Sequence, residues 1–356
     1  MHAQQTLRIG MVAAGLLAAL MLSIACSATS AVADPGPGLA GVATYSVDGR
    51  ATLEQLSDRF ESLSLNHGWL ADTVYTYPDD RNLALRAWRT VHGGAALWIL
   101  AGIHGEEPAG PNAIASNLAS IIELAESGVP VVVIPLCNPK GYRNNWRYPN
   151  TPDRDWRKGG YSVGDAEYLL PDLETGTQPR AAAAPGPETR ALTEFVLRLS
   201  ETHPPRLVLD LHEDELSTEG GYVYSQGSRA ADHPVVVDVI RQLQSSGIPI
   251  RLSGRTRFDE PIVDGVISRD DKGAPIRDGS IDELLASTEV IANGTRVAGP
   301  AAPTVIVVET PAFAGSRFDL RVAAHGAVIR HVADLWRLNW EALEESAPDA
   351  DTGSRH

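Results

Sequence analysis

Cysteine is almost absent from this chain of 356 residues, which contains only Cys26 and Cys137. A framework of several disulfide bonds, on which many small exported domains depend, is therefore excluded. Aromatic residues are also few, at 6% of the chain, but 43% of all residues are hydrophobic. A chain of this length and composition can bury a large core without disulfides, and we expect one main domain.

Basic residues are also fewer than acidic residues. The chain has 30 lysine and arginine residues against 45 aspartate and glutamate residues, which gives a formal net charge of −15. Nucleic acids and anionic membrane surfaces attract basic proteins, so this balance argues against both as partners. It does not identify a substrate.

One apolar run, Ile9 to Ala25, lies at the amino end, after a single cation at Arg8 and before small residues that close on Ala33. This order predicts a signal peptide over residues 1–33 and an exported protein, whether secreted, periplasmic or cell-wall-associated. A transmembrane anchor is the alternative. The run is short for an anchor and lacks a positive flank on its far side, so we expect no stable membrane insertion after cleavage. A lipoprotein acylated at Cys26 is a further alternative.

Cleavage after Ala33 would remove one arginine and no acidic residue, so the net charge would become −16. It would also leave Cys137 as the only cysteine, which makes an internal disulfide impossible. We divide the remaining chain into an amino-terminal extension (34–82), one main domain (83–345) and a disordered tail (346–356).

The most informative stretch begins with an apolar run, Ala96 to Ile103, that has the length and composition of a strand covered on both faces. Gly102 and Gly105 allow a sharp turn after it. His104 and Glu107 then lie three residues apart, on one face of a helical first turn, and provide two of the three ligands of a catalytic zinc site. Because this pattern often arises by chance, a surface turn with solvated glutamates is the alternative until a third ligand is found.

A second strand end offers that third ligand. An apolar segment closes on Asp210-Leu211-His212, a position suited to projecting an imidazole from the carboxyl edge of a sheet. Asp210 and His212 point to the same face of a strand. Asp210 therefore either supports this imidazole from behind or makes a hydrogen bond elsewhere in the sheet, and the sequence leaves both open.

The order of elements predicts a largely parallel sheet. A strand over 96–103, a helix over roughly 111–126 and a strand over 129–136 form a right-handed crossover. Residues 251–300 have too little periodicity to be assigned. Further elements are expected over residues 52–65 (a helix with Thr52 as its N-cap), 69–77, 83–91 and 303–311.

A long loop without apolar periodicity runs from Cys137 to Arg157. It carries aromatic and arginine side chains, among them Trp146, Tyr148, Trp156, Arg143, Arg147, Arg154 and Arg157. Loops of this length inside a compact domain are usually functional, and such arginines could stabilise an oxyanion or bind a carboxylate. An ordered surface loop pinned by its aromatic residues is the alternative.

Four segments in this order resemble a known family: His104-Gly105-Glu106-Glu107, Asn138-Pro139-Lys140-Gly141, Asp210-Leu211-His212 and the strand that carries Glu309 near its end. Over roughly residues 83–343 the chain resembles the zinc carboxypeptidases. The resemblance is strongest to the branch with the bacterial murein peptide amidases and the succinylglutamate desuccinylase and aspartoacylase enzymes. None of the segments is specific alone, but together they are.

The resemblance implies an α/β fold, a mixed and largely parallel sheet of about eight strands flanked by helices. It also implies one zinc ion (Zn²⁺) per chain, held by His104, Glu107 and His212. Glu309 would be the general base that takes a proton from the zinc-bound water and returns it to the leaving nitrogen.

For substrate contacts, the resemblance implies Arg147 at the oxyanion and Arg154 at a substrate carboxylate, with Asn138 and Asp153 also in the substrate site. The family usually has Asn-Arg-Asn around the second arginine, whereas this chain has Asp153-Arg154-Asp155. Two flanking acids weaken the attraction of Arg154 for an anion. A substrate carrying an amine as well as a carboxylate, such as a diamino acid in a cell-wall peptide, would suit this mixed site.

We therefore expect an exported zinc metallopeptidase of the carboxypeptidase or amidase type, which hydrolyses an amide bond in a peptide, a murein peptide or an acylated amino acid. A non-catalytic peptide- or cell-wall-binding protein on the same fold is the alternative. Glu309 discriminates between them, because a binding protein does not need the base. An esterase is a weaker third reading, and the oligomeric state is not fixed by the sequence. No tyrosine follows Tyr224, which favours the amidase and deacylase branch over the digestive carboxypeptidases.

Overall fold

The computed structural model describes residues 48–155, 158, 160, 186–215, 217–227, 232–269, 280–292, 295–312 and 316–345. All of them belong to one compact unit, Val42–His356. The predicted signal peptide, Cys26 and the predicted tail 346–356 lie outside the described residues, as do Trp156 and Arg157 of the long loop 137–157.

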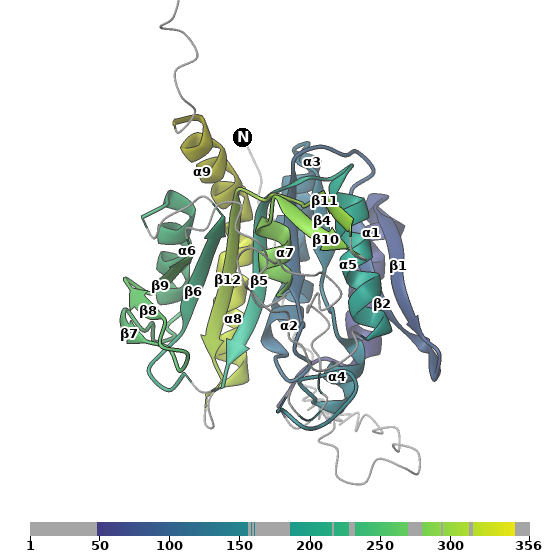
Figure 1. The fold of residues 1–356 in the computed structure, drawn as a ribbon, viewed down its shortest axis with the longest axis horizontal. Coiled ribbons are helices and arrows are strands. Elements are labelled where there is room, and N and C mark those ends of the chain that lie inside the picture. Colours follow the sequence, from purple (N-terminus) through teal and green to yellow (C-terminus); the bar gives the residue numbers. More distant parts are fainter. Residues whose placement is uncertain are drawn as a thin grey trace, which may run out of the picture. The chain divides into compact units, whose positions relative to one another are not determined.

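A mixed sheet of ten strands forms the centre of this unit, in the order β1-β2-β4-β3-β5-β12-β6-β9-β8-β7 (Figure 1). The strands are β1 (Leu70–Tyr77), β2 (Asp80–Arg89), β3 (Ala96–Ala101), β4 (Val131–Ile134), β5 (Pro205–Asp214), β6 (Tyr222–Gly227), β7 (Ser253–Arg255), β8 (Pro261–Val263), β9 (Val266–Arg269) and β12 (Thr304–Pro311). The neighbours β4, β3, β5 and β12 are parallel, and antiparallel pairs are added toward both edges. The predicted mixed α/β fold with a parallel centre is confirmed.

The sheet has two strands more than the eight expected from the sequence. Three strands at one edge, β7, β8 and β9, lie in the segment 251–300 that was left unassigned, and each has only three or four residues. Strands this short cannot show the alternation of apolar and polar residues on which assignment depends. This is why the segment 251–300 could not be assigned in advance.

Helices cover both faces of the sheet (Figure 1). One face, which carries Leu97, Ile99 and Leu209, shares a hydrophobic core with α1 (Leu53–His67), α2 (Ala109–Ser116), α3 (Leu118–Glu126), α6 (Pro234–Ser245), α8 (Phe318–Arg330) and α9 (Val332–Glu345). The other face, which carries Trp98 and Val208, packs against α5 (Pro187–Ser200), α7 (Ile281–Ala286) and the separate hairpin β10 (Glu289–Ala292) and β11 (Thr295–Ala298). Because both faces are covered, the central strands are apolar throughout rather than alternating.

The helix expected over residues 111–126 is divided at Asn117. Its side-chain amide donates a hydrogen bond to the Ala113 carbonyl oxygen (2.8 Å), and its backbone leaves the helical conformation with φ at −125°. A side chain that bonds to the preceding turn competes with the regular helical ladder. The segment therefore forms two shorter helices, α2 and α3.

The predicted extension contributes to the same core as the main domain. Leu56, Phe60 and Leu63 of α1 are buried in it, and β1 pairs with β2 across the proposed boundary at residue 82. Thr52 caps α1 as expected, in a capping box with Gln55. Residues 52–82 therefore fold with the rest of the unit rather than as an appendage.

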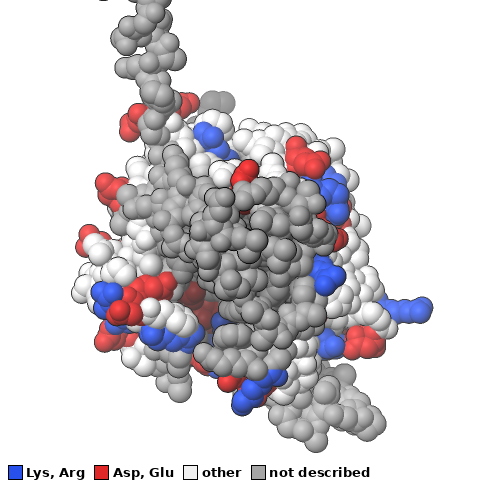
Figure 2. Space-filling view, in the orientation of Figure 1, with Lys and Arg blue, Asp and Glu red and all other residues white. Residues whose placement is uncertain are grey.

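Among the residues that the structure describes, no helix is both long and apolar enough to cross a membrane. On the face drawn in Figure 2, the acidic and basic side chains of the described residues lie interspersed. The excess of negative charge is therefore not gathered into one field on the described part of that face.

Candidate metal centre

The turn after β3 is shaped by close contact with a neighbouring segment, α4 (Pro139–Asn144). Gly102 has φ at +65°, in the left-handed region that favours glycine. A Cβ atom on Gly105 would lie 2.0 Å from the carbonyl carbon of Gly141. Only glycine fits at this contact, so the path of the chain between His104 and Glu107 is fixed by the backbone of α4.

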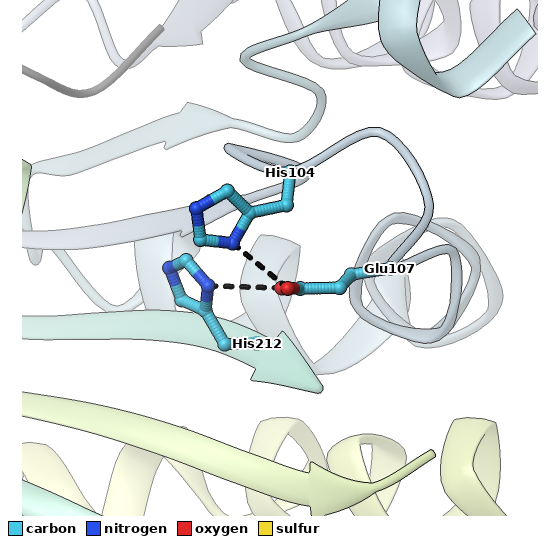
Figure 3. A group of neighbouring side chains, drawn as sticks. All are labelled: His104, Glu107 and His212. Atoms are coloured by element: carbon cyan, nitrogen blue, oxygen red, sulfur yellow. Dashed lines mark hydrogen bonds and ion pairs between the residues drawn. The ribbon is translucent and has the colours of Figure 1, made fainter. Parts of the chain in front are cut away.

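Three side chains converge at the carboxyl edge of the sheet (Figure 3). His104 Nδ1 lies 2.8 Å from Glu107 Oε1, and His212 Nδ1 lies 3.0 Å from Glu107 Oε2. The two imidazole rings are 5.0 Å apart between centroids. One potential ligand atom from each residue lies within 4.8 Å of the other two. The structure thus brings together the three residues predicted to bind the metal.

Burial and mutual contacts shift the pKa values of these groups. Burial and the positive charge of Arg147 lower the pKa of His104 to about 3, so its imidazole is neutral at neutral pH. Burial alone would raise the pKa of Glu107, but its contacts with His104 and His212 outweigh burial and hold the pKa well below its ordinary value. A neutral imidazole and an anionic carboxylate are the forms that bind a cation.

Asp210 lies behind the His212 imidazole. Its Oδ2 is 3.2 Å from His212 Nε2, and the aspartate is fully buried. Burial would lower the pKa of His212, but the negative charge of Asp210 outweighs it and holds this pKa well above its ordinary value. On the other side of the ring, Nδ1 faces Glu107 Oε2 at 3.0 Å. A carboxylate that keeps the ring proton on Nε2 would leave Nδ1 available to a metal ion. Of the two roles open for Asp210, the structure therefore favours support of the imidazole.

The donor set fits a divalent metal, zinc in particular. Two imidazole nitrogens and one carboxylate are the protein ligands of many catalytic zinc sites, in which a fourth position stays open to water or substrate. His104 Nδ1 is buried and lacks a well-aligned hydrogen bond, although it lies close to Glu107. Such an atom is satisfied if a cation lies between the three side chains.

Glu309 reaches the same edge from the neighbouring strand. It is the register partner of His212 in the parallel pair of β12 and β5. Burial raises the pKa of Glu309 well above its ordinary value, and the positive charge of His212 offsets this only in part. The predicted base is thus brought alongside the predicted metal ligands, in an environment that makes its carboxylate more basic.

Arg147 also belongs to this cluster. Its Nη1 lies 3.1 Å from Oε1 of Glu107 and 3.1 Å from Oε1 of Glu106. Burial would lower the pKa of Arg147, but the charges of these two glutamates raise it above its ordinary value, so the side chain stays cationic. The arginine predicted at the oxyanion is therefore next to the metal ligands.

Asn138, which was predicted to lie in the substrate site, makes two hydrogen bonds within the chain through its side-chain amide. Its side chain is fully buried, its Oδ1 accepts a hydrogen bond from the backbone N–H of Gly141 (2.8 Å), and its Nδ2 donates to the Arg147 carbonyl oxygen (3.1 Å). The first bond caps α4 and the second fixes the segment that carries Arg147. Through these two bonds Asn138 supports the segments around the site.

The two other residues predicted to bind substrate differ in position. Arg154 approaches the cluster, since its Nη2 lies 3.7 Å from Glu106 Oε1 and its Nη1 pairs with Glu215. Asp153 makes local contacts instead: its carboxylate accepts from the Asp155 backbone N–H (3.0 Å) and pairs with Lys158 (3.0 Å). The structure therefore brings Arg154 to the site and leaves Asp153 in its own turn.

Two residues outside the predicted set of site residues also support the site. Arg50 donates hydrogen bonds to the carbonyl oxygens of Gly105 (3.4 Å) and Tyr142 (3.3 Å), although it lies in a segment with the composition of a linker. Glu213 is buried, accepts from the Ala109 backbone N–H (2.5 Å) and pairs with Arg321 (2.6 Å). The sequence gives no signal for these partners, because all of them are distant along the chain.

Comparison with known proteins addresses the fold. No family model matches the chain, and no curated protein matches it in sequence. Solved structures do: one from Shewanella baltica assigned as a metallopeptidase is 22% identical at a TM-score of 0.59, over 80% of this chain and 92% of that one. A second structure assigned as a metallopeptidase, from Shewanella amazonensis, is 23% identical at a TM-score of 0.59. This match covers 80% of this chain and 93% of that chain. Carboxypeptidase A of Helicoverpa armigera is 12% identical at a TM-score of 0.53, and the match covers 84% of this chain and 74% of that chain.

The chain has the zinc carboxypeptidase fold. Identities this low establish a shared fold and do not carry over an activity. What the protein does must therefore be argued from the residues at the carboxyl edge of its own sheet.

Proposed function

We propose that the protein is an exported zinc-dependent peptidase or amidase, which hydrolyses an amide bond in a peptide, a murein peptide or an acylated amino acid. The convergence of His104, Glu107 and His212, with Glu309 beside them on β12, carries this proposal. The fold shared with metallopeptidases and a carboxypeptidase is consistent with it.

The three ligands define the chemistry available. His104, Glu107 and His212 would hold one zinc ion, with the His212 ring oriented by Asp210. When bound, zinc would polarise the scissile carbonyl and lower the pKa of the attacking water.

Glu309 is assigned the proton transfers. It accepts a proton from the attacking water while the water oxygen forms a bond to the carbonyl carbon. It then donates that proton to the leaving nitrogen as the carbon–nitrogen bond breaks. Burial raises the pKa of Glu309, which makes its carboxylate a stronger base toward the attacking water.

The arginines are assigned to the substrate. Arg147 stays cationic beside the metal ligands, so it can stabilise the negative charge that develops on the carbonyl oxygen. Arg154 is the more exposed of the two, with 45% of its side chain accessible, and it is assigned to the distal part of the substrate together with the neighbouring Asp153.

A metal count and an activity screen test this function together. Zinc is measured by elemental analysis of the purified mature protein, and C-terminal dipeptides, muropeptides and N-acyl amino acids are screened for hydrolysis with and without a chelator. One zinc per chain with chelator-sensitive cleavage is the expected result, and the preferred substrate class identifies the branch. Zinc without turnover favours the non-catalytic binding protein, and absence of zinc overturns the metal centre.

Export is part of the proposal and rests on the amino-terminal apolar run. Amino-terminal sequencing of protein recovered outside the cytoplasm is expected to start at Asp34. A chain that starts at an acylated Cys26 would make the protein a lipoprotein, and an intact amino terminus would overturn cleavage.

A further inference from the structure

Glu106 lies between the two arginines assigned to the substrate. Its Oε1 is 3.1 Å from Arg147 Nη1 and 3.7 Å from Arg154 Nη2, and only 7% of its side chain is exposed. Arg154 also pairs with Glu215. Both guanidinium groups are therefore already engaged by carboxylates of the chain itself.

This arrangement disfavours a free carboxylate as the group that a substrate presents to Arg154. To bind there, a substrate anion must compete with Glu106 and Glu215 for the guanidinium group. Displacing Glu106 would leave a buried carboxylate with less positive charge around it, which is costly. Two carboxylates of the chain, Glu106 and Glu215, therefore already lie beside the Arg154 guanidinium group.

The second oxygen of Glu106 favours the opposite kind of substrate group. Its Oε2 is buried and has no hydrogen-bond partner among the described residues. A carboxylate oxygen only accepts hydrogen bonds, so a group that supplies N–H donors would satisfy it. An ammonium or carboxamide group supplies such donors, whereas a carboxylate group has none.

We propose that Glu106 is a specificity-determining residue, which makes the site prefer a substrate whose distal group donates hydrogen bonds, a primary amine or a carboxamide, over one that ends there in a free carboxylate. The inference rests on the proposed function, because it concerns the substrate of the same site. The zinc ligands do not determine the charge of the substrate group that lies beside Arg154, whereas Glu106 does.

Three N-acyl dipeptides that differ only in their terminal group provide the test: a carboxylate, a carboxamide and a primary amine. For the wild-type protein we expect kcat/KM for the amide and amine compounds to exceed that for the carboxylate by about tenfold or more. Glu106→Gln should shrink this ratio severalfold, mainly by improving the carboxylate compound. A ratio that stays unchanged in Glu106→Gln, or a wild-type preference for the carboxylate, overturns the proposal.

Control variants separate specificity from damage to the site. Glu106→Asp keeps the charge and should keep the order of preference. Glu215→Gln removes the exposed partner of Arg154 and should shift the ratio in the same direction as Glu106→Gln, even if the latter folds poorly. Glu341→Gln removes the same charge from the surface of α9 and should have no effect. Zinc content is measured for each variant.

A binding measurement separates this proposal from the proposed function. Dissociation constants for the same three compounds are determined by calorimetry on zinc-loaded Glu309→Gln protein, and on wild-type protein if it hydrolyses none of them. Absence of hydrolysis by the wild type would contradict the function, while the order of the dissociation constants still decides the role of Glu106. Equal binding of the three compounds, or no binding of any, overturns the inference.

Discussion

His212 on β5 and Glu309 on β12 are register partners in two parallel strands at the centre of the sheet. Neighbouring strands are spaced by about 4.8 Å, and register partners project to the same face. The distance between a metal ligand and the proposed base is therefore set by backbone hydrogen bonds of the sheet rather than by a loop. A site that must align a water with a carbonyl carbon benefits from such a rigid support.

Glu309→Gln should separate metal binding from catalysis. We expect wild-type zinc content, because Glu309 is not among the three ligands, and a fall in kcat of about 10²–10⁴-fold, because a neutral amide cannot accept the proton. Zinc analysis and steady-state kinetics check both expectations, and Glu341→Gln on the surface of α9 is the control. A variant that binds zinc and hydrolyses as fast as the wild type would show that the base is another residue.

Zinc should stabilise the folded protein through the same three ligands. At a free zinc concentration of 100 times the dissociation constant, we expect a gain of about 2.7 kcal/mol in the free energy of unfolding, visible as a higher Tm. His104→Ala should abolish the gain, whereas His67→Ala, outside the site at the end of α1, should retain it. Thermal unfolding with and without zinc is the measurement. Equal gains in all three proteins would place the metal elsewhere.

The convergence of the proposed metal ligands was predictable because their signals are local or follow from topology. His104 and Glu107 are three residues apart in one turn, so their spacing predicts that they lie close together, and contact with α4 holds that turn. His212 and Glu309 come from strands far apart in sequence, but both lie near the carboxyl ends of buried strands. Parallel strands bring such ends to one edge, and the two residues meet there.

The surroundings of the ligands were not predictable in the same way. The pairing of Glu106 with Arg154 and the contact of Arg50 with Gly105 join segments that only the folded chain brings together. Asn138 was assigned to the substrate from a motif, yet its amide is used to cap α4 and to fix Arg147. A motif gives the residue type at a position, but it does not show which neighbours will form hydrogen bonds with that side chain.

Asp210→Asn should weaken zinc binding without removing a ligand. Asp210 contacts His212 Nε2 at 3.2 Å, and loss of a carboxylate that orients a metal-binding imidazole typically lowers metal affinity by about 10–100-fold. Competition with a chromophoric chelator measures the affinity. Asp334→Asn, an exposed position on α9, is the control. Wild-type affinity in Asp210→Asn would mean that the His212 ring is held without its help.

Arg50→Ala should destabilise the protein and loosen the metal-binding turn. Arg50 donates hydrogen bonds to the Gly105 and Tyr142 carbonyl oxygens and to Asn145 Oδ1 (2.7 Å). We expect the free energy of unfolding to fall by about 2 kcal/mol, because charged hydrogen bonds are lost at a buried position. Urea unfolding is the measurement.

Two further variants show whether this effect is specific to Arg50. Arg50→Lys should recover only part of the loss, since an ammonium group cannot reproduce the fork of a guanidinium. Arg59→Ala, exposed on α1, should change stability little. If Arg50→Ala unfolds at the same urea concentration as the wild type, the contacts of Arg50 contribute no net stability.

Arg147→Ala should lower kcat far more than it raises KM. A charge that acts on the oxyanion is used in the transition state and little in the bound substrate, and loss of such a donor costs about 10²–10³-fold in kcat. Arg147→Lys should restore part of the rate, and Arg143→Ala, whose partner is Asp80 outside the site, should be nearly neutral. Because Arg147 also contacts Glu107, zinc content must be equal in the proteins compared. A higher KM at unchanged kcat would instead place Arg147 in binding of the ground state, and the oxyanion would then need another partner.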